Sequence, residues 1–77
     1  MYIAPMGREL LGIRVRGIRH DRGLTIGQLA RLAHLNVNTV SRIERGHTSP
    51  KIEVLEKIAA ALGVTTARLL GSEDNGE

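Results

Sequence analysis

The 77-residue sequence contains no cysteine, no phenylalanine and no tryptophan, and only one tyrosine. Without cysteine, neither a disulfide framework nor a thiolate metal site can hold the fold, which favours an intracellular, cytoplasmic protein. No apolar run approaches the roughly 20 residues that a membrane-spanning helix needs, so we expect no membrane partner. The opening residues "MYIAPMG" lack the basic start and continuous apolar centre of a secretory signal.

Groups that could bind a metal or carry catalysis are few. The sequence has three isolated histidines, His20, His34 and His47. They lack the spacing that places several ligands on one face, so we expect neither a metal nor another cofactor. His20 and Asp21 could be combined with a serine into a triad, but a domain this small offers little concave space that excludes water. We therefore do not expect an enzyme.

Basic residues outnumber acidic ones and are unevenly placed. All eleven Lys and Arg precede residue 72, together with five acids, so residues 1–71 carry a net charge of +6; the other three acids follow them. The sequence pI is about 10.2. This balance fits a polyanionic partner, although a cationic surface that is merely solvated explains the charge about equally well.

The composition divides the chain into three segments. Residues 1–7 contain Pro5 and Gly7 and are expected to form an N-terminal arm, with a disordered leader or an extra packing strap as the alternatives. Residues 8–71 are expected to form the folded domain. Residues 72–77 are rich in Gly, Ser and acids, cannot bury a core, and are expected to form a flexible acidic tail.

Residues 8–22 have an apolar side chain at every third or fourth position, which predicts a helix. The apolar face consists of Leu11, Val15 and Ile18. Gly12 and Gly17 each lower the intrinsic stability of this helix by roughly 1 kcal/mol, so it must depend on packing against its neighbours. Gly23 then supplies a stop.

Two short helices are predicted next. Thr25 is a good N-cap residue, and Gln28 follows three positions later, which is the reciprocal pattern of a capping box. Asn36 is again an N-cap residue and opens a third helix that ends at Gly46. The side chains expected to be buried are Leu29, Ala30 and Ala33 in the second helix and Val40 and Ile43 in the third.

Two further helices complete the domain. An apolar stripe along residues 52–62 predicts the fourth helix. Thr65 or Thr66 can cap a short last helix, whose Leu69 and Leu70 we expect to close the core. Five helices and no credible strand make the predicted fold all-α.

The second and third predicted helices are separated by little more than residues 34–36. Helices joined by so short a turn cross at a steep angle, and Ala30 is small enough to let the two backbones approach. This is helix-turn-helix geometry. In this geometry the third helix protrudes from the rest of the domain, so it can enter a DNA major groove about 12 Å wide.

The chain also contains "IRHDRGLT", "VSRIERG", a following "SP" and "LEKIAAALGV" at characteristic spacing. On these motifs, from about Leu11 to Leu70, it resembles the Cro and phage-repressor-like helix-turn-helix proteins, the XRE family. The resemblance implies an all-α, five-helix lambda-repressor-like DNA-binding domain whose second and third helices form the helix-turn-helix. It also implies a sequence-specific transcriptional regulator that binds double-stranded DNA as a homodimer on a near-palindromic operator.

By this resemblance, the third helix reads bases through Val37, Asn38, Thr39 and Arg42. Asn38 can offer a donor and an acceptor to adenine, and Arg42 can donate twice to the O6 and N7 of guanine. Val37 would contact a thymine methyl. The alternative is that these are ordinary solvated residues, but a β-branched apolar residue at the exposed start of a helix has no packing reason to be there.

The resemblance implies phosphate contacts around this helix from Thr25, Gln28, Asn36, Arg45, His47 and Thr48. For His47, an ordinary surface-loop role fits nearly as well. The family pairs the arginine matching Arg19 with the glutamate matching Glu44 beneath the recognition helix, so we expect a half-buried bidentate pair that fixes orientation.

Two positions depart from the family's pattern. His34 stands where the family usually has Gly in the turn, so this residue must either adopt a positive φ or avoid it. Ile26 stands at the first position of the second helix, which is often a phosphate-binding Gln.

A single recognition helix covers few base pairs, so a two-fold dimer is expected. The family's dimers often meet near the last helix, which here offers Val64, Ala67, Arg68 and Leu70. Tyr2, Ile3 and Met6 could instead extend that interface or cover the core. An alternative function is an antitoxin or co-regulator whose main role is to bind a protein partner, which the sequence does not identify.

Overall fold

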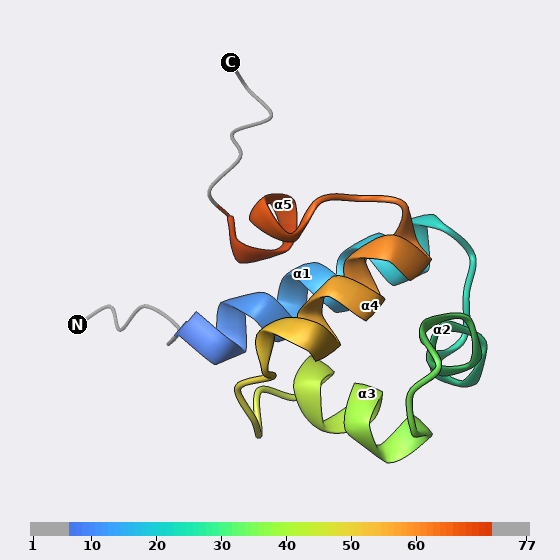
Figure 1. Ribbon diagram of the computed structural model, residues 1–77, viewed down its shortest axis with the longest axis horizontal. Helices are drawn as coiled ribbons and strands as arrows, with labels where there is room; N and C mark the ends of the chain where they lie inside the picture. The colour runs from blue at the N-terminus through green and yellow to red at the C-terminus, as the bar shows by residue number, and fades with distance from the viewer. Residues whose placement is uncertain (1–6, 72–77) are drawn as a thin grey trace.

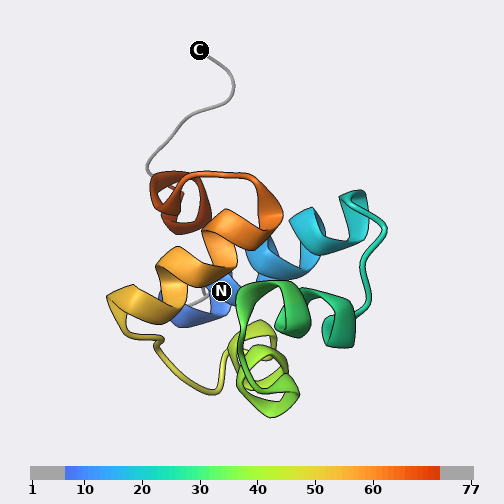
Figure 2. The same cartoon turned by 45° about the vertical axis from the view of Figure 1, so that its right-hand side comes forward.

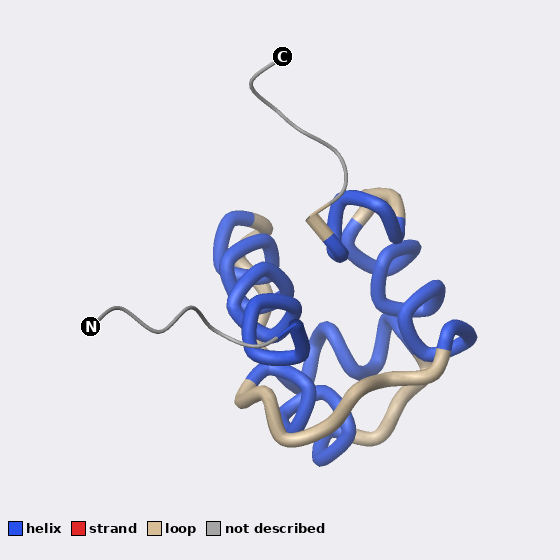
Figure 3. Tube along the Cα trace, turned by 90° about the vertical axis from the view of Figure 1, so that its left-hand side faces the viewer, coloured by secondary structure: helices blue, strands red, loops and turns tan. Residues whose placement is uncertain are grey.

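The computed structural model of this chain describes residues 7–71 and is entirely helical in that range. Its helices are α1 (Gly7–Asp21), α2 (Ile26–Ala33), α3 (Val37–Glu44), α4 (Ile52–Leu62) and α5 (Thr66–Leu70). Figure 3 shows these helices joined by loops, with no strand in the described range. The all-α, five-helix prediction is confirmed.

The ends of the chain lie outside the described residues. They include most of the expected arm, with Tyr2, Ile3 and Met6, and the expected tail at residues 72–77. Gly7, which we expected at the end of the arm, is instead the first residue of α1. Within residues 7–71, no helix has both the length and the apolar character needed to cross a membrane.

The long helices α1 and α4 cross the middle of the molecule, with α5 on one side of them and α3 on the other (Figure 1). In the rotated view, α2 lies beside α3, and α3 stands at the lower edge of the molecule (Figure 2). Helix α3 packs against both α1 and α2. The core is thus enclosed by all five helices, while one side of α3 faces outward.

The buried core follows the predicted apolar stripes. Its members are Leu11, Val15, Ile18, Leu29, Ala30, Val40, Ile43, Leu55, Ile58, Ala59, Leu62 and Leu69. The expectation that Leu70 also closes the core is wrong, because its side chain is 54% exposed whereas that of Leu69 is fully buried. Successive residues of a helix point about 100° apart, so the short α5 can direct only one of the two inward.

Local hydrogen bonds explain where three helices begin. The Gln28 backbone N–H donates to Thr25 Oγ1 at 3.0 Å, and the Thr25 N–H donates to Gln28 Oε1 at 2.8 Å, which completes the predicted capping box. The Asn38 N–H donates to Asn36 Oδ1 at 2.8 Å. Thr65, one of the two predicted caps, accepts from the N–H of residue 68 at 3.0 Å and starts α5.

Candidate nucleic-acid interface

The connection between α2 and α3 is a tight left-handed turn. His34 ends α2 with φ 57° and ψ 44°, so it adopts the positive φ that a turn glycine would supply. The Leu35 N–H donates to the Ala30 carbonyl at 2.8 Å, which closes the end of α2. Ala30 and Ala33 are both buried where the helices meet. The turn therefore sets the direction in which α3 leaves α2.

Helix α3 has an inward and an outward side. Val40 and Ile43 are buried in the core. Asn38 and Arg42 are exposed, and because they are four residues apart they lie on the same face of the helix. Val37 is 49% exposed at the first position of α3. Three of the four residues predicted to read bases are thus accessible together.

Thr39, the fourth predicted base-contacting residue, is only partly exposed. It lies next to Asn38 but is turned about 100° from it around the helix axis. The accessible face of α3 is therefore centred on Asn38 and Arg42, with Thr39 at its margin.

An ion pair joins α1 to the end of α3, as predicted, but it is almost fully buried and not half-buried as we expected. Arg19 donates from Nε to Glu44 Oε2 at 2.6 Å and from Nη2 to Glu44 Oε1 at 2.9 Å, and the two side chains are only 8% and 4% exposed. The hydrogen bond to Glu44 raises the pKa of Arg19, against the opposing effect of burial. Arg19 also donates from Nη1 to the Leu24 carbonyl at 2.9 Å. One guanidinium thus ties α3 and the start of the helix-turn-helix to α1.

Gly12 explains how α1 and α3 approach each other so closely. A Cβ added at Gly12 would lie 2.5 Å from the carbonyl oxygens of both Ile43 and Glu44. No side chain fits between these backbones. The glycine that weakens α1 in isolation is therefore the residue that lets α3 pack against it, which the sequence indicated only as a dependence on packing.

A second arginine contact was not predicted. Arg22 donates from Nε to the Leu62 carbonyl at 3.0 Å and so ties the end of α1 to the end of α4. No sequence signal could have indicated it, because the acceptor is a backbone carbonyl that every residue carries.

The predicted phosphate-contacting residues lie at the start of α2 and at the two ends of α3. Thr25 and Gln28 stand at the start of α2, and Asn36 stands at the start of α3, all exposed. Their oxygens accept the capping hydrogen bonds, which leaves the donor hydrogens of the same groups for another acceptor. At the far end of α3, Arg45 and His47 are exposed, and Thr48 is partly exposed.

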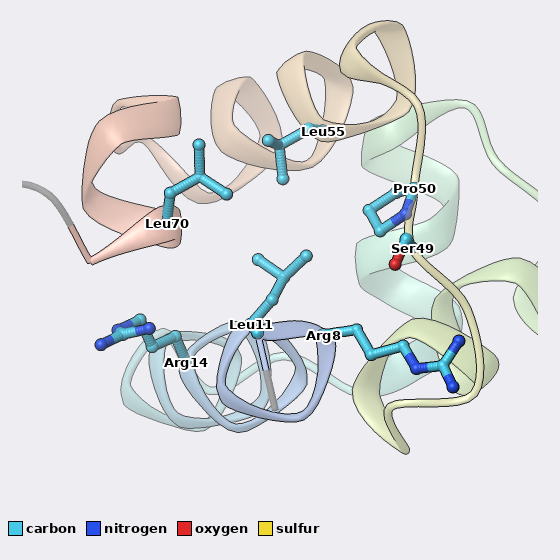
Figure 4. Close-up of a pocket in the computed structure, with 8 residues that line it drawn as sticks. Arg8, Leu11, Arg14, Ser49, Pro50, Leu55 and Leu70 are labelled. Atoms are coloured by element: carbon cyan, nitrogen blue, oxygen red, sulfur yellow. The ribbon is translucent and has the colours of Figure 1, made fainter. Parts of the chain in front are cut away.

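A cavity of about 320 Å³ lies between α1, α4 and α5, away from the exposed face of α3. Leu11, Leu55 and Leu70 point into it, while Arg8 and Arg14 extend to either side (Figure 4). No His, Asp or Glu of the described range lines it. Across residues 7–71, no three side chains of these types come together as a metal site. The cavity thus offers no acid–base pair.

The residues predicted for a dimer surface differ in exposure. Val64 packs against the core and is only partly exposed, as are Ala67 and Arg68. Leu70 is the most open of the four. The exposure that excludes Leu70 from the core thus leaves it accessible to another chain.

Similarity to known proteins agrees with this geometry. A sequence model of the helix-turn-helix domain family matches residues 10–70. The chain is 38% identical over 63 residues to the immunity repressor protein of Bacillus phage phi105, covering 82% of this chain and 44% of that protein. It is 35% identical over 69 residues to the HTH-type transcriptional regulator SinR of Bacillus licheniformis, covering 88% and 62%. The chain spans about half the length of the curated relatives it matches.

Two solved structures share the fold. The clp gene regulator ClgR of C. glutamicum superposes with a TM-score of 0.83 at 33% identity, covering 91% of this chain and 90% of that chain. The restriction-modification controller protein C.AhdI of Aeromonas hydrophila superposes with a TM-score of 0.77 at 32% identity, covering 82% and 94%. These matches confirm the resemblance inferred from the motifs. The relatives are named as regulators and repressors, which confirms the expectation that the chain is not an enzyme.

Proposed function

This chain belongs to the helix-turn-helix domain family, and we propose that it is a sequence-specific transcriptional regulator that binds double-stranded DNA as a homodimer. The observation that carries the proposal is the outward face of α3. Asn38 and Arg42 are exposed one turn apart on a helix whose opposite side is fixed in the core. Such a helix can lie in a major groove with these two side chains directed at base edges.

The proposed roles follow from the chemistry of each side chain. Arg42 donates two hydrogen bonds to the O6 and N7 of a guanine, and Asn38 pairs with the N6 and N7 of an adenine. Val37 contacts a thymine methyl group, and Thr39 supports these contacts from the margin of the face. Each well-formed bidentate contact contributes about 1–3 kcal/mol of discrimination against the wrong base.

Backbone contacts position the helix without reading sequence. We assign them to Thr25, Gln28, Asn36, Arg45, His47 and Thr48. Their placement at the start of α2 and at both ends of α3 supports this role, because the two phosphate backbones border the groove that α3 would occupy.

A dimer is part of the proposal because one α3 covers only a few base pairs. Two copies related by a two-fold axis would place their α3 helices in successive major grooves, about 34 Å apart, on a near-palindromic operator. We assign the contact between copies to Val64, Ala67, Arg68 and Leu70, of which Leu70 supplies the exposed apolar surface. Occupancy of the operator then depends on the concentration of the dimer, and its position relative to a promoter decides the effect on transcription.

The experiment that tests the proposal is selection of bound duplexes from a random DNA pool, with the wild-type protein and with Arg42→Ala in parallel. Wild type should recover a near-palindromic site. Arg42→Ala should lose the preference at one symmetric base pair and keep it elsewhere. Its fold should be unchanged, because the Arg42 side chain is exposed.

Arg31→Ala is the matched control, because Arg31 is exposed near the end of α2 and is not assigned to DNA. It should recover the wild-type site. Weak binding by wild type that ignores sequence would contradict the proposal. That result would favour the antitoxin or co-regulator alternative, in which the chain mainly binds a protein partner.

A further inference from the structure

A cleft of about 180 Å³ lies along one side of α3, where α1, α2 and α3 meet. It is lined by Arg16, Arg19, Ile26, Ser41, Glu44 and Arg45. The side chains of Arg16 and Ser41 form no hydrogen bond or ion pair within residues 7–71, and neither residue is among those proposed to read bases.

The cleft has a net positive charge because the charges of Arg19 and Glu44 cancel each other, which leaves those of the other two arginines. Arg19 donates to both carboxylate oxygens of Glu44, so this pair contributes no net charge. Arg16 and Arg45 are both exposed. Within residues 7–71, neither guanidinium forms an ion pair or hydrogen bond. Two unpaired cations therefore face one cleft.

The donors of the cleft define the class of ligand. Two guanidiniums close to a shared space repel each other, and an anion between them removes that repulsion while accepting hydrogen bonds from both. The hydroxyl of Ser41 adds a third donor on the α3 wall. A phosphate group, which has several acceptor oxygens and prefers guanidinium donors, matches this set.

The position of the cleft relative to α3 indicates the source of the phosphate. Ser41 and Arg45 directly neighbour Arg42 and Asn38 around the helix, so the cleft borders the face proposed to read bases. When α3 lies in a major groove, the structure bordering the groove is the DNA backbone. We propose that Arg16, Ser41 and Arg45 together hold one backbone phosphate of the operator. Arg16 thereby contacts DNA from α1, outside the helix-turn-helix.

This inference rests on the proposed DNA-binding function, and its test separates the two. Affinity for the selected duplex is measured over a range of salt concentrations for wild type, Arg16→Ala, Arg16→Lys and Lys57→Ala. Lys57 is the matched control, because it is exposed on α4 and lines no part of this cleft. Its substitution by alanine removes the same unit of charge as Arg16→Ala. Each phosphate contact contributes about 0.9 to the slope of log affinity against log salt.

Arg16→Ala should lower that slope by about 0.9 and weaken binding on all duplexes alike, whereas Arg16→Lys and Lys57→Ala should keep the wild-type slope. Equal slopes for Arg16→Ala and Lys57→Ala, with wild type still selecting its site, would overturn the phosphate site alone. Failure of wild type to bind any duplex would overturn the proposed function and this inference together.

A neutral methylphosphonate, placed in turn at each backbone position of the duplex, shows whether the phosphate belongs to the DNA. One substitution should weaken wild type clearly more than it weakens Arg16→Ala, in which only Ser41 and Arg45 still contact that phosphate. If no position behaves in this way, the cleft does not bind the backbone, and a free anion becomes its only phosphate source.

Discussion

Arg19 of α1 and Glu44 of α3 are 25 positions apart in the sequence and are joined by two hydrogen bonds of 2.6 and 2.9 Å. Both side chains are more than nine-tenths buried, so neither group can be fully hydrated if its partner is lost. The pair therefore determines where the last turn of α3 lies relative to α1. Through that turn it also determines the orientation of the face that we propose reads DNA.

We predict that Glu44→Ala destabilises the domain much more than a change at an exposed glutamate. The substitution leaves the Arg19 guanidinium buried without its carboxylate, which costs about 3 kcal/mol or more. For a domain of this size, that corresponds to a fall in Tm of at least about 10 °C. Glu53→Ala, in the exposed first turn of α4, should cost less than about 1 kcal/mol. Thermal melting in which the two variants are equally mild would contradict the prediction.

Two glycines of α1 should respond in opposite ways to alanine. Both substitutions improve helix propensity by roughly 1 kcal/mol. Gly17 has open space around it, so Gly17→Ala should stabilise the domain. At Gly12 the new Cβ would meet two α3 carbonyl oxygens at 2.5 Å, so Gly12→Ala should destabilise by about 1–3 kcal/mol.

Denaturant unfolding of both glycine variants measures the difference. A stabilised Gly12→Ala protein would mean that α1 and α3 do not approach as closely as the structure places them. Gly12→Ala should also weaken DNA binding more than its loss of stability explains, because the displaced backbone is that of α3.

Replacing His34 with glycine should stabilise the domain. Its φ of 57° is a conformation that costs a residue with a Cβ about 1–2 kcal/mol, whereas glycine adopts it freely. His34→Gly loses some of this advantage because its unfolded chain is more flexible, so the expected net gain is about 0.5–1 kcal/mol. His34→Val should be destabilising, since a β-branched residue is least tolerant of this φ. If His34→Val melts at the same temperature as His34→Gly, or at a higher one, the backbone at residue 34 is not strained.

The helices and their caps could be predicted from the sequence because their causes are local. Thr25 and Gln28 form the capping box that their spacing indicates, and Asn36 caps α3 through a bond to a residue two positions away. Burial of Val40 and Ile43 also follows from local periodicity. The Arg19–Glu44 pair joins distant positions, and it was predicted only because the motifs resemble a family in which that pair occurs.

What the sequence did not reveal depends on three-dimensional proximity. The contact of Arg22 with the Leu62 carbonyl and the shared cleft of Arg16 and Arg45 have no sequence pattern of their own. Leu69 and Leu70 are chemically identical neighbours, so no periodicity within a five-residue helix decides which of them is buried. The packing of α5 against α1 and α4 determines that Leu69 is the buried residue.

The difference between Leu69 and Leu70 yields a test of the proposed dimer. Leu69→Ala removes a fully buried side chain and should cost about 2–5 kcal/mol of stability. Leu70→Ser alters a side chain that is 54% exposed, so it should change monomer stability little while weakening self-association.

Sedimentation velocity over a range of concentrations should place the monomer–dimer transition of Leu70→Ser at a higher concentration than that of wild type. Ile52→Ser removes a comparably exposed apolar side chain from the start of α4 and is the control, which should leave the transition in place. If both serine variants associate as wild type does, Leu70 lies outside the contact between copies, and the dimer must use another surface.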